Sequence, residues 1–201
     1  AHESGARYVT IYDTGLGGCL YSKAGIDIPA LLEIVDEHGP RAFEFYASQR
    51  GAEFGDFSWR DELLKAGGAI DLFLPCAASQ TVTHGAAEKM VALGLKYVSE
   101  GANNPTTPEA DREFLENGVV LIPDVLANAG GVAGSYMEMS KAASMSIPTE
   151  HETLEAVRGI LTTAWEHVTS ACDAYGTKSL RLAGDALAIS KIAAAHKVRG
   201  W

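Results

Sequence analysis

Hydrophobic residues along this chain alternate between short continuous runs and longer segments in which they recur every three or four positions. A short apolar run bounded by turn residues predicts a buried strand, and three-to-four spacing predicts an amphipathic helix. Four such runs predict strands, over residues 7–12, 69–74, 96–99 and 119–122. Because helical segments separate them, the pattern predicts an α/β fold, with a mostly parallel sheet and helices on both faces.

Helix-start and helix-stop residues mark the segments between these strands. Asp27 is expected to cap a helix that runs to about residue 37, with Pro29 in the tolerated first turn. A second helix is expected over residues 83–93. The run Thr107-Pro108-Glu109 combines a hydroxyl cap, a proline and an acid, and it predicts a helix that stops at Asn117-Gly118.

After Pro123 the pattern predicts only helices. From Thr149 onward, apolar residues three and four positions apart form one long face that ends before Gly176, namely Leu154, Val157, Leu161, Ala164, Val168, Ala171 and Tyr175. We expect this face to pack on the chain's own sheet or on a neighbouring domain. A last helix is expected over residues 180–197. The chain is therefore interpreted as one domain over residues 1–201, with a helical part from about residue 149.

Composition narrows the class of protein. The 201 residues are 47% hydrophobic and 21% charged, which is ordinary for a soluble globular domain. A net charge of -10 without clustered Lys and Arg argues against binding to nucleic acid or to an anionic membrane surface. No apolar run reaches the roughly 20 residues that span a bilayer. The first seven residues lack a signal-peptide pattern. Three scattered cysteines without a CxxC pair disfavour a zinc site and favour a reducing, cytoplasmic location.

The glycine-rich run 13–18, which begins with Asp13, allows three interpretations. A phosphate-binding loop would need a third glycine where Leu20 stands and a helix directly afterwards, but residues 21–25 are typical of a turn. Alternatively, Asp13 ends the second strand of a dinucleotide fold and accepts hydrogen bonds from an adenosine ribose. A third reading gives Asp13 only a turn-forming role. We disfavour the first and leave the other two open.

Two segments place small residues and an asparagine just after an expected strand, 99–108 and 128–133. In open α/β sheets ligands bind at the carboxyl ends of strands, where small residues let the backbone approach a cofactor. Asn103 and Asn128 each offer a donor and an acceptor, so we predict that they bind a carboxamide or a ribose hydroxyl. The alternative is that each asparagine only caps a helix or satisfies a loop.

Two further positions extend this candidate site. Pro75-Cys76-Ala77-Ala78 ends a strand with small residues and is expected to leave room for a nucleotide. Cys76 as a nucleophile is disfavoured because no His or Lys lies nearby in sequence, and a simple buried cysteine is favoured. Ser135 lies seven residues beyond Asn128, two turns along an expected helix, and its hydroxyl could donate to a substrate carboxylate.

Taken together, these motifs resemble the cofactor-binding domain of glutamate dehydrogenase of the shorter, hexameric type. The resemblance is carried by Leu74-Pro75-Cys76-Ala77, Glu100-Gly101-Ala102-Asn103, Pro105-Thr106-Thr107 and Asn128-Ala129-Gly130-Gly131-Val132-Ala133, with Ser135 and Glu138-Met139 beyond them. It implies a Rossmann-like domain facing a separate substrate domain across a cleft. It also implies oxidative deamination of L-glutamate to 2-oxoglutarate and ammonia, with hydride passing to NAD or NADP.

By the same resemblance, Asn128 would hold the nicotinamide carboxamide, Asn103 would lie at the nicotinamide ribose, and Ser135 would help bind the side-chain carboxylate of the substrate. Cys76, Ala77 and Gly101 fall in the cofactor-binding motifs of the family. Asp13 favours NAD because a carboxylate repels a 2′-phosphate, although a protonated or turned-away acid could tolerate NADP.

The chain departs from the family pattern in three ways. The family's glycine fingerprint and first strand would precede residue 1, and its catalytic lysines and aspartate lie in the preceding substrate domain, so no catalytic residue is assigned here. Ala78-Ser79-Gln80 stands where the family has Thr-Gln-Asn, and Gly184-Asp185-Ala186 stands where it has Gly-Ala-Asn.

Loss of a central first strand would leave a neighbouring strand with unpaired backbone groups. We therefore expect this chain to be the cofactor-binding half of a longer, oligomeric polypeptide, inactive in isolation. Two alternatives remain open: a truncated, non-catalytic relative that acts as a binding or assembly module, and a related leucine, phenylalanine or valine dehydrogenase.

Overall fold

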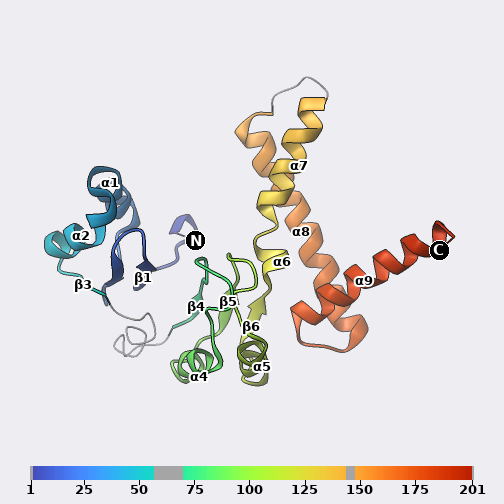
Figure 1. Cartoon of the computed structure of the whole chain (residues 1–201), viewed down its shortest axis with the longest axis horizontal. Coiled ribbons are helices and arrows are strands. Elements are labelled where there is room, and N and C mark those ends of the chain that lie inside the picture. The colour runs from blue at the N-terminus through green and yellow to red at the C-terminus, as the bar shows by residue number, and fades with distance from the viewer. Residues whose placement is uncertain (1, 57–69, 144–147, 201) are drawn as a thin grey trace. The chain divides into compact units, whose positions relative to one another are not determined.

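The structure is a computed structural model that describes residues 2–56, 70–143 and 148–200. The chain divides into two compact units. The first comprises Ala1–Ile70 with Ala92–Gly94, and the second comprises Asp71–Val91 with Leu95–Trp201 (Figure 1). The single domain expected from the sequence stays a prediction.

The first unit contains a three-stranded antiparallel sheet in the order β1-β2-β3. The strands are β1 (Thr10–Asp13), β2 (Gly18–Tyr21) and β3 (Glu53–Gly55). The strand expected over residues 7–12 is therefore present a few residues later. Its antiparallel pairing with β2 and the strands β2 and β3 themselves were not predicted. Gly18, the first residue of β2, has a φ of 141°, and a Cβ there would lie 2.7 Å from the Gly55 carbonyl oxygen. Position 18 therefore requires glycine. The glycines of this run thus turn a hairpin, and no helix directly follows them.

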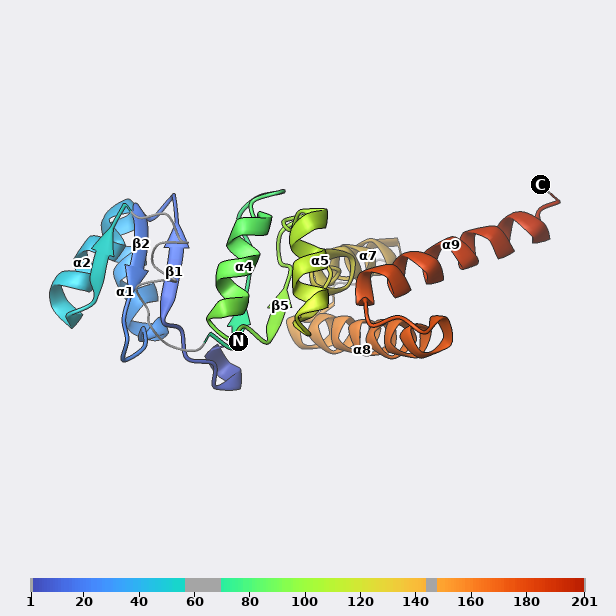
Figure 2. The same ribbon diagram turned by 90° about the horizontal axis from the view of Figure 1, so that it is seen from below.

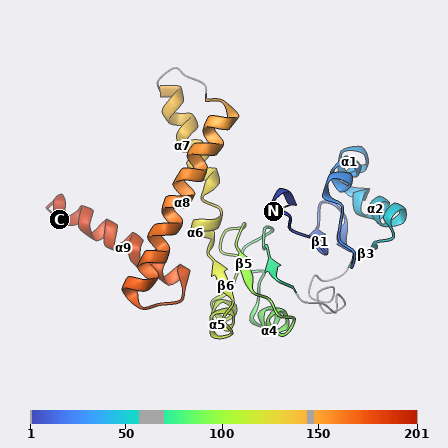
Figure 3. The same cartoon turned by 180° about the vertical axis from the view of Figure 1, so that it is seen from behind.

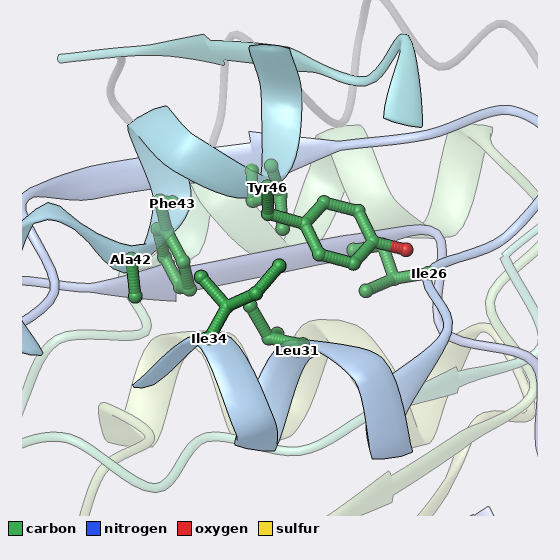
Figure 4. Close-up of a cluster of buried hydrophobic side chains, with 7 residues drawn as sticks. Ile26, Leu31, Ile34, Ala42, Phe43 and Tyr46 are labelled. Carbon is green, nitrogen blue, oxygen red and sulfur yellow. The ribbon is translucent and has the colours of Figure 1, made fainter. Parts of the chain in front are cut away.

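Helices α1 (Ile28–His38) and α2 (Ala42–Arg50) cover this sheet, joined by the short η2 (Gly39–Arg41), and η1 (His2–Ser4) precedes it. The predicted cap of α1 is confirmed, since the Asp27 carboxylate accepts a hydrogen bond from the Ala30 N–H at 3.2 Å. Helix α2 was not predicted. Both helices contribute to one core (Figure 4), which consists of Leu20, Ile26, Leu31, Ile34, Ala42, Phe43 and Tyr46. The Tyr46 hydroxyl accepts from the Asp27 N–H at 2.7 Å, which links α2 to the start of α1.

The second unit contains a parallel sheet in the order β4-β5-β6. Its strands are β4 (Leu72–Phe73), β5 (Tyr97–Ser99) and β6 (Val120–Ile122). The intervening helices are α4 (His84–Ala92) and α5 (Pro108–Glu116), which lie next to each other in Figures 1 and 2. The predictions for β5, β6, α4 and α5 are confirmed within a residue or two. For the strand expected over 69–74, residue 69 lies outside the described residues and only Leu72 and Phe73 pair.

After β6 the described residues form only helices as regular elements, as the pattern predicted: α6 (Asp124–Ala127), α7 (Gly130–Ala143), α8 (Glu150–Tyr175) and α9 (Leu180–Val198), all visible in Figure 3. Leu126, Val168, Ala171, Leu180 and Ala183 form a shared core of α6, α8 and α9. On the predicted apolar face of α8, Val168 and Ala171 are buried in this core, whereas Leu154 and Tyr175 are exposed in this chain. Packing of the exposed part on a neighbouring domain stays a prediction. In the described part of the chain, no helix is both long and apolar enough to cross a membrane.

Candidate functional site

Asn103 and Asn128 contact each other at the carboxyl end of the parallel sheet. The Asn128 Nδ2 donates to Asn103 Oδ1 at 2.8 Å and lies 3.4 Å from the Gly101 carbonyl oxygen. Asn103 sits in the loop after β5, and Asn128 is the residue that ends α6, just after β6. The loops meet because neighbouring parallel strands end at the same edge of a sheet.

The amide pair keeps hydrogen-bonding capacity for a ligand. Across residues 2–56, 70–143 and 148–200, neither Asn103 Nδ2 nor Asn128 Oδ1 has a hydrogen-bond partner. Asn103 is exposed and Asn128 is half-buried. One donor and one acceptor held side by side match the donor and acceptor of a carboxamide, and they also match ribose hydroxyls. These residues therefore fit the nicotinamide end of a dinucleotide.

The loop after β4 joins the same edge. The Ala102 N–H donates to the Pro75 carbonyl at 2.9 Å, and a Cβ on Gly101 would lie 2.6 Å from Cys76 Sγ. Glycine at position 101 is thus explained by the close approach of two loops. The expectation of a buried cysteine is wrong, because Cys76 is exposed, as is Ala77. Both follow the last paired residue of β4, where the chain has left the sheet.

Asn104 fixes the loop that carries Asn103. Its backbone adopts a φ of 47°, a conformation that asparagine tolerates better than most residues. The Asn104 carbonyl accepts three hydrogen bonds, from Gln80 N at 2.9 Å, Gln80 Nε2 at 3.1 Å and Ser79 Oγ at 3.1 Å. The Asn104 N–H donates to Asp124 Oδ2 at 2.8 Å. This residue is therefore held from both neighbouring loops.

An arginine beneath these loops was missed by the sequence analysis. The Arg181 guanidinium, in the first turn of α9, contacts three carboxylates. Its Nη2 donates to both oxygens of Glu100 at 2.8 Å, its Nε to Asp111 Oδ2 at 2.8 Å, and its Nη1 to Asp124 Oδ1 at 3.2 Å. Burial lowers the pKa of Arg181, but hydrogen bonds and charge from Glu100 and Asp111 outweigh that effect and raise it further above its usual value.

Glu100 is the buried centre of this Arg181 cluster. Its side chain is 0% exposed, and besides Arg181 it accepts the Asp124 N–H at 2.8 Å. A buried carboxylate is stable only when paired and fully hydrogen-bonded, which this arrangement provides. The sequence offered one signal, an acid directly after a buried strand. The partner lies 81 positions away, so no local pattern connects the two.

Asp13 lies at the end of β1, and Ser135 lies on α7. Asp13 Oδ1 accepts the Gly15 N–H at 2.7 Å and the Leu16 N–H at 3.1 Å, as the turn-forming interpretation predicted. Its ribose contact stays a prediction. The helical relation between Asn128 and Ser135 is wrong, because α7 begins at Gly130 and Asn128 precedes it. Ser135 is exposed on α7, and its substrate contact stays a prediction.

The parallel sheet, its crossover helices and the amide-lined strand ends define a Rossmann-like α/β domain. Residues 1–200 match the family model of Glutamate/Leucine/Phenylalanine/Valine dehydrogenase. The chain belongs to this family.

The relatives it resembles in sequence are glutamate dehydrogenases of both cofactor types. An NAD-specific glutamate dehydrogenase from Clostridioides difficile is 34% identical over 90% of this chain and 40% of its own length. The catabolic NAD-specific glutamate dehydrogenase RocG of Bacillus subtilis is 33% identical over 100% of this chain and 43% of its own length. An NADP-specific enzyme from Saccharolobus shibatae is 32% identical over 99% of this chain and 44% of its own length. The chain thus spans less than half of these relatives.

Solved structures agree with this assignment. Glutamate dehydrogenase from Plasmodium falciparum has a TM-score of 0.80 and 25% identity over 97% of this chain and 41% of that one. A K89L mutant of glutamate dehydrogenase has a TM-score of 0.82 and 29% identity over 99% of this chain and 44% of that one. The α/β, Rossmann-like fold class inferred from the sequence is confirmed.

Proposed function

We propose that this chain is the cofactor-binding part of an NAD- or NADP-dependent glutamate dehydrogenase, which converts L-glutamate to 2-oxoglutarate and ammonia. The contact between Asn103 and Asn128 is the observation that carries the proposal, because it presents a carboxamide-matching donor and acceptor at the sheet edge. Family membership over residues 1–200 supports it. No group in this chain is assigned to the chemical step, which is assigned to a separate substrate domain.

The roles proposed for the chain's residues concern binding and orientation. The bound nicotinamide supplies the hydride acceptor. Asn128 holds its carboxamide, and Asn103 contacts the adjoining ribose. Gly101, Cys76 and Ala77 allow close approach of the loop backbone. Fixing the ring matters because hydride transfer requires the reacting atoms to be held in a productive orientation.

Asp13 and Ser135 are proposed to act at the two ends of the bound molecules. Asp13 contacts the adenosine ribose, where a carboxylate disfavours the 2′-phosphate of NADP. Ser135 donates to the side-chain carboxylate of glutamate. We further propose that the full-length protein is a homo-oligomer, which light scattering on the purified protein tests by its mass.

Fluorescence titration of the full-length protein with NADH and NADPH tests the cofactor assignment. Asn128→Ala is expected to raise the Kd for the preferred cofactor about tenfold, which corresponds to losing about one to two net hydrogen bonds. Asn117→Ala is the matched control, because Asn117 caps the end of α5 and, in the described part of the chain, its side chain bonds only to Glu113. Equal affinities for wild type and Asn128→Ala would contradict the site.

Substrate preference is measured on the same preparation. Glutamate oxidation faster than that of leucine, phenylalanine or valine supports a glutamate dehydrogenase. A preference for one of the apolar amino acids would assign the chain to that branch of its family, and Ser135→Ala should then leave the preference unchanged. Absence of both activity and cofactor binding would favour a non-catalytic binding module.

A further inference from the structure

We propose that Arg181 and Asp124 are positioning residues for cofactor binding, which act by holding the loop that carries Asn103. The inference rests on the proposed function, since it concerns the affinity of the same site. Neither residue belongs to the cofactor contacts proposed above. Their connection to the site runs through two hydrogen bonds of one carboxylate.

Asp124 is the link between the Arg181 cluster and the amide pair. One of its oxygens, Oδ1, accepts from Arg181 Nη1 at 3.2 Å, and the other, Oδ2, accepts from the Asn104 N–H at 2.8 Å. Its own N–H donates to Glu100 Oε2, so the carboxylate is anchored at the start of α6. Asn104 adjoins Asn103, whose Oδ1 receives the bond from Asn128.

The loop needs such support because Asn104 holds a positive φ. A non-glycine residue in this region persists when the surrounding contacts over-determine it. The three bonds to the Asn104 carbonyl hold one side, and Asp124 holds the other. Loss of the Asp124 contact would free the N–H side of this residue and allow the Asn103 amide to leave Asn128.

Asp111 provides a matched control within the same cluster. Its carboxylate accepts from Arg181 Nε at 2.8 Å, and in the described part of the chain that side chain makes no other hydrogen bond. Asp111→Asn and Asp124→Asn both remove one negative charge from beside Arg181. At position 111 the amide oxygen can still accept from the guanidinium. At position 124 one of two donors faces an NH2 group, whichever way the amide points.

Titration of the full-length proteins with the preferred reduced cofactor, NADH or NADPH, tests the proposal. Asp124→Asn is expected to raise the Kd about 5- to 10-fold and Asp111→Asn less than about 2-fold, in line with the loss of one charged hydrogen bond in the first case. Urea unfolding of both variants reports folding separately. If the two variants bind equally well, the proposal is overturned.

A double-mutant cycle distinguishes positioning from general destabilisation. Because Asp124 acts through the amide pair, Asp124→Asn in the Asn128→Ala background should raise the Kd less than about 2-fold further. A full additive effect in that background would overturn the proposal. Failure of the wild-type protein to bind either cofactor would instead contradict the proposed function itself.

Arg181→Lys is the second variant, used in case Asp124→Asn unfolds. A lysine ammonium can pair with Glu100, but it lacks the planar fork that reaches three carboxylates at once. We expect weaker cofactor binding in Arg181→Lys, with the KM for cofactor raised more than kcat is lowered. An unchanged KM for cofactor in a folded Arg181→Lys protein would contradict the role.

Discussion

Gly101 and Cys76 show how closely two loops approach at the proposed site. A Cβ added to Gly101 would lie 2.6 Å from Cys76 Sγ but 3.5 Å from Cys76 Cβ. The steric conflict therefore involves the sulfur alone. Only a small residue at position 101 allows both loops to keep their backbone hydrogen bond from Ala102 to Pro75.

Gly101→Ala is expected to lower the free energy of unfolding by about 1 kcal/mol, because an added methyl group must displace the thiol. Cys76→Ala removes the sulfur and should suppress the effect, so that Gly101→Ala costs much less in the Cys76→Ala background. Urea unfolding of the two single variants and the double variant measures this. Equal costs in both backgrounds would show that the sulfur is not the obstacle.

Residues recognisable from the sequence are those whose role follows from the neighbouring chain. Asn103 and Asn128 were predicted because each follows an apolar strand, and the structure brings them together. Arg181 was not predicted, because its partners lie 57 to 81 positions away. Asp13 shows a further limit of prediction from sequence. A carboxylate at the end of a strand suits both a ribose contact and a turn, so its position alone does not decide between the two roles.

At the scale of elements, helix ends can also be predicted when they are determined by residues close together in the sequence. The caps by Asp27 and Thr107 were predicted and are present, because a cap depends on residues three positions apart. The cap by Thr149 is of the same kind but was not predicted. Strand β2 was missed because it is only four residues long and begins inside the glycine-rich run, which was interpreted as a loop. Helix α2 was missed because it has nine residues and its buried face, Ala42, Phe43 and Tyr46, covers little more than one turn, which is too short for the apolar spacing to stand out.

The stability contributed by the capping box at the start of α8 is expected to depend on pH. Backbone and hydroxyl donors of Thr149 lower the pKa of Glu152, so the capping box stabilises the fold above the unfolded pKa. This stabilisation is lost as pH falls through the folded pKa. Removal of the hydroxyl in Thr149→Ala should cost about 1 kcal/mol at neutral pH.

Urea unfolding of Glu152→Gln from about pH 7 to about pH 3 measures the effect, since carboxyl groups protonate in that range. The variant should be less stable than wild type at neutral pH, and the difference should shrink as the wild-type carboxylate takes up its proton. Glu150→Gln is the control in the same helical turn. A difference that stays constant with pH would contradict a role for the charge.

At the scale of the whole molecule, the alternation of strands and helices predicted the parallel sheet and the helical C-terminal part. It did not predict the antiparallel sheet of residues 10–55, because its turns depend on positive φ at glycines rather than on apolar periodicity. The chain spans less than half of these relatives, so sequence patterns within it can indicate a candidate binding site but not the groups proposed to act on the substrate.

Refolding of the full-length protein should restore secondary structure before cofactor binding. The Arg181 contacts close loops of 57, 70 and 81 residues, and long-range contacts form late because the chain entropy they remove is large. In stopped-flow refolding, the helical circular dichroism signal should recover before the fluorescence enhancement of NADH or NADPH. Simultaneous recovery would contradict this order.

The position of Arg181 in α9 also has a consequence during synthesis. Both asparagines of the amide pair leave the ribosome more than fifty residues ahead of the arginine. A nascent chain can thus expose the complete set of proposed coenzyme ligands while the cation beneath them has not yet been made. On this proposal, affinity for the coenzyme arises only after α9 has been synthesised and Arg181 has reached its three carboxylates.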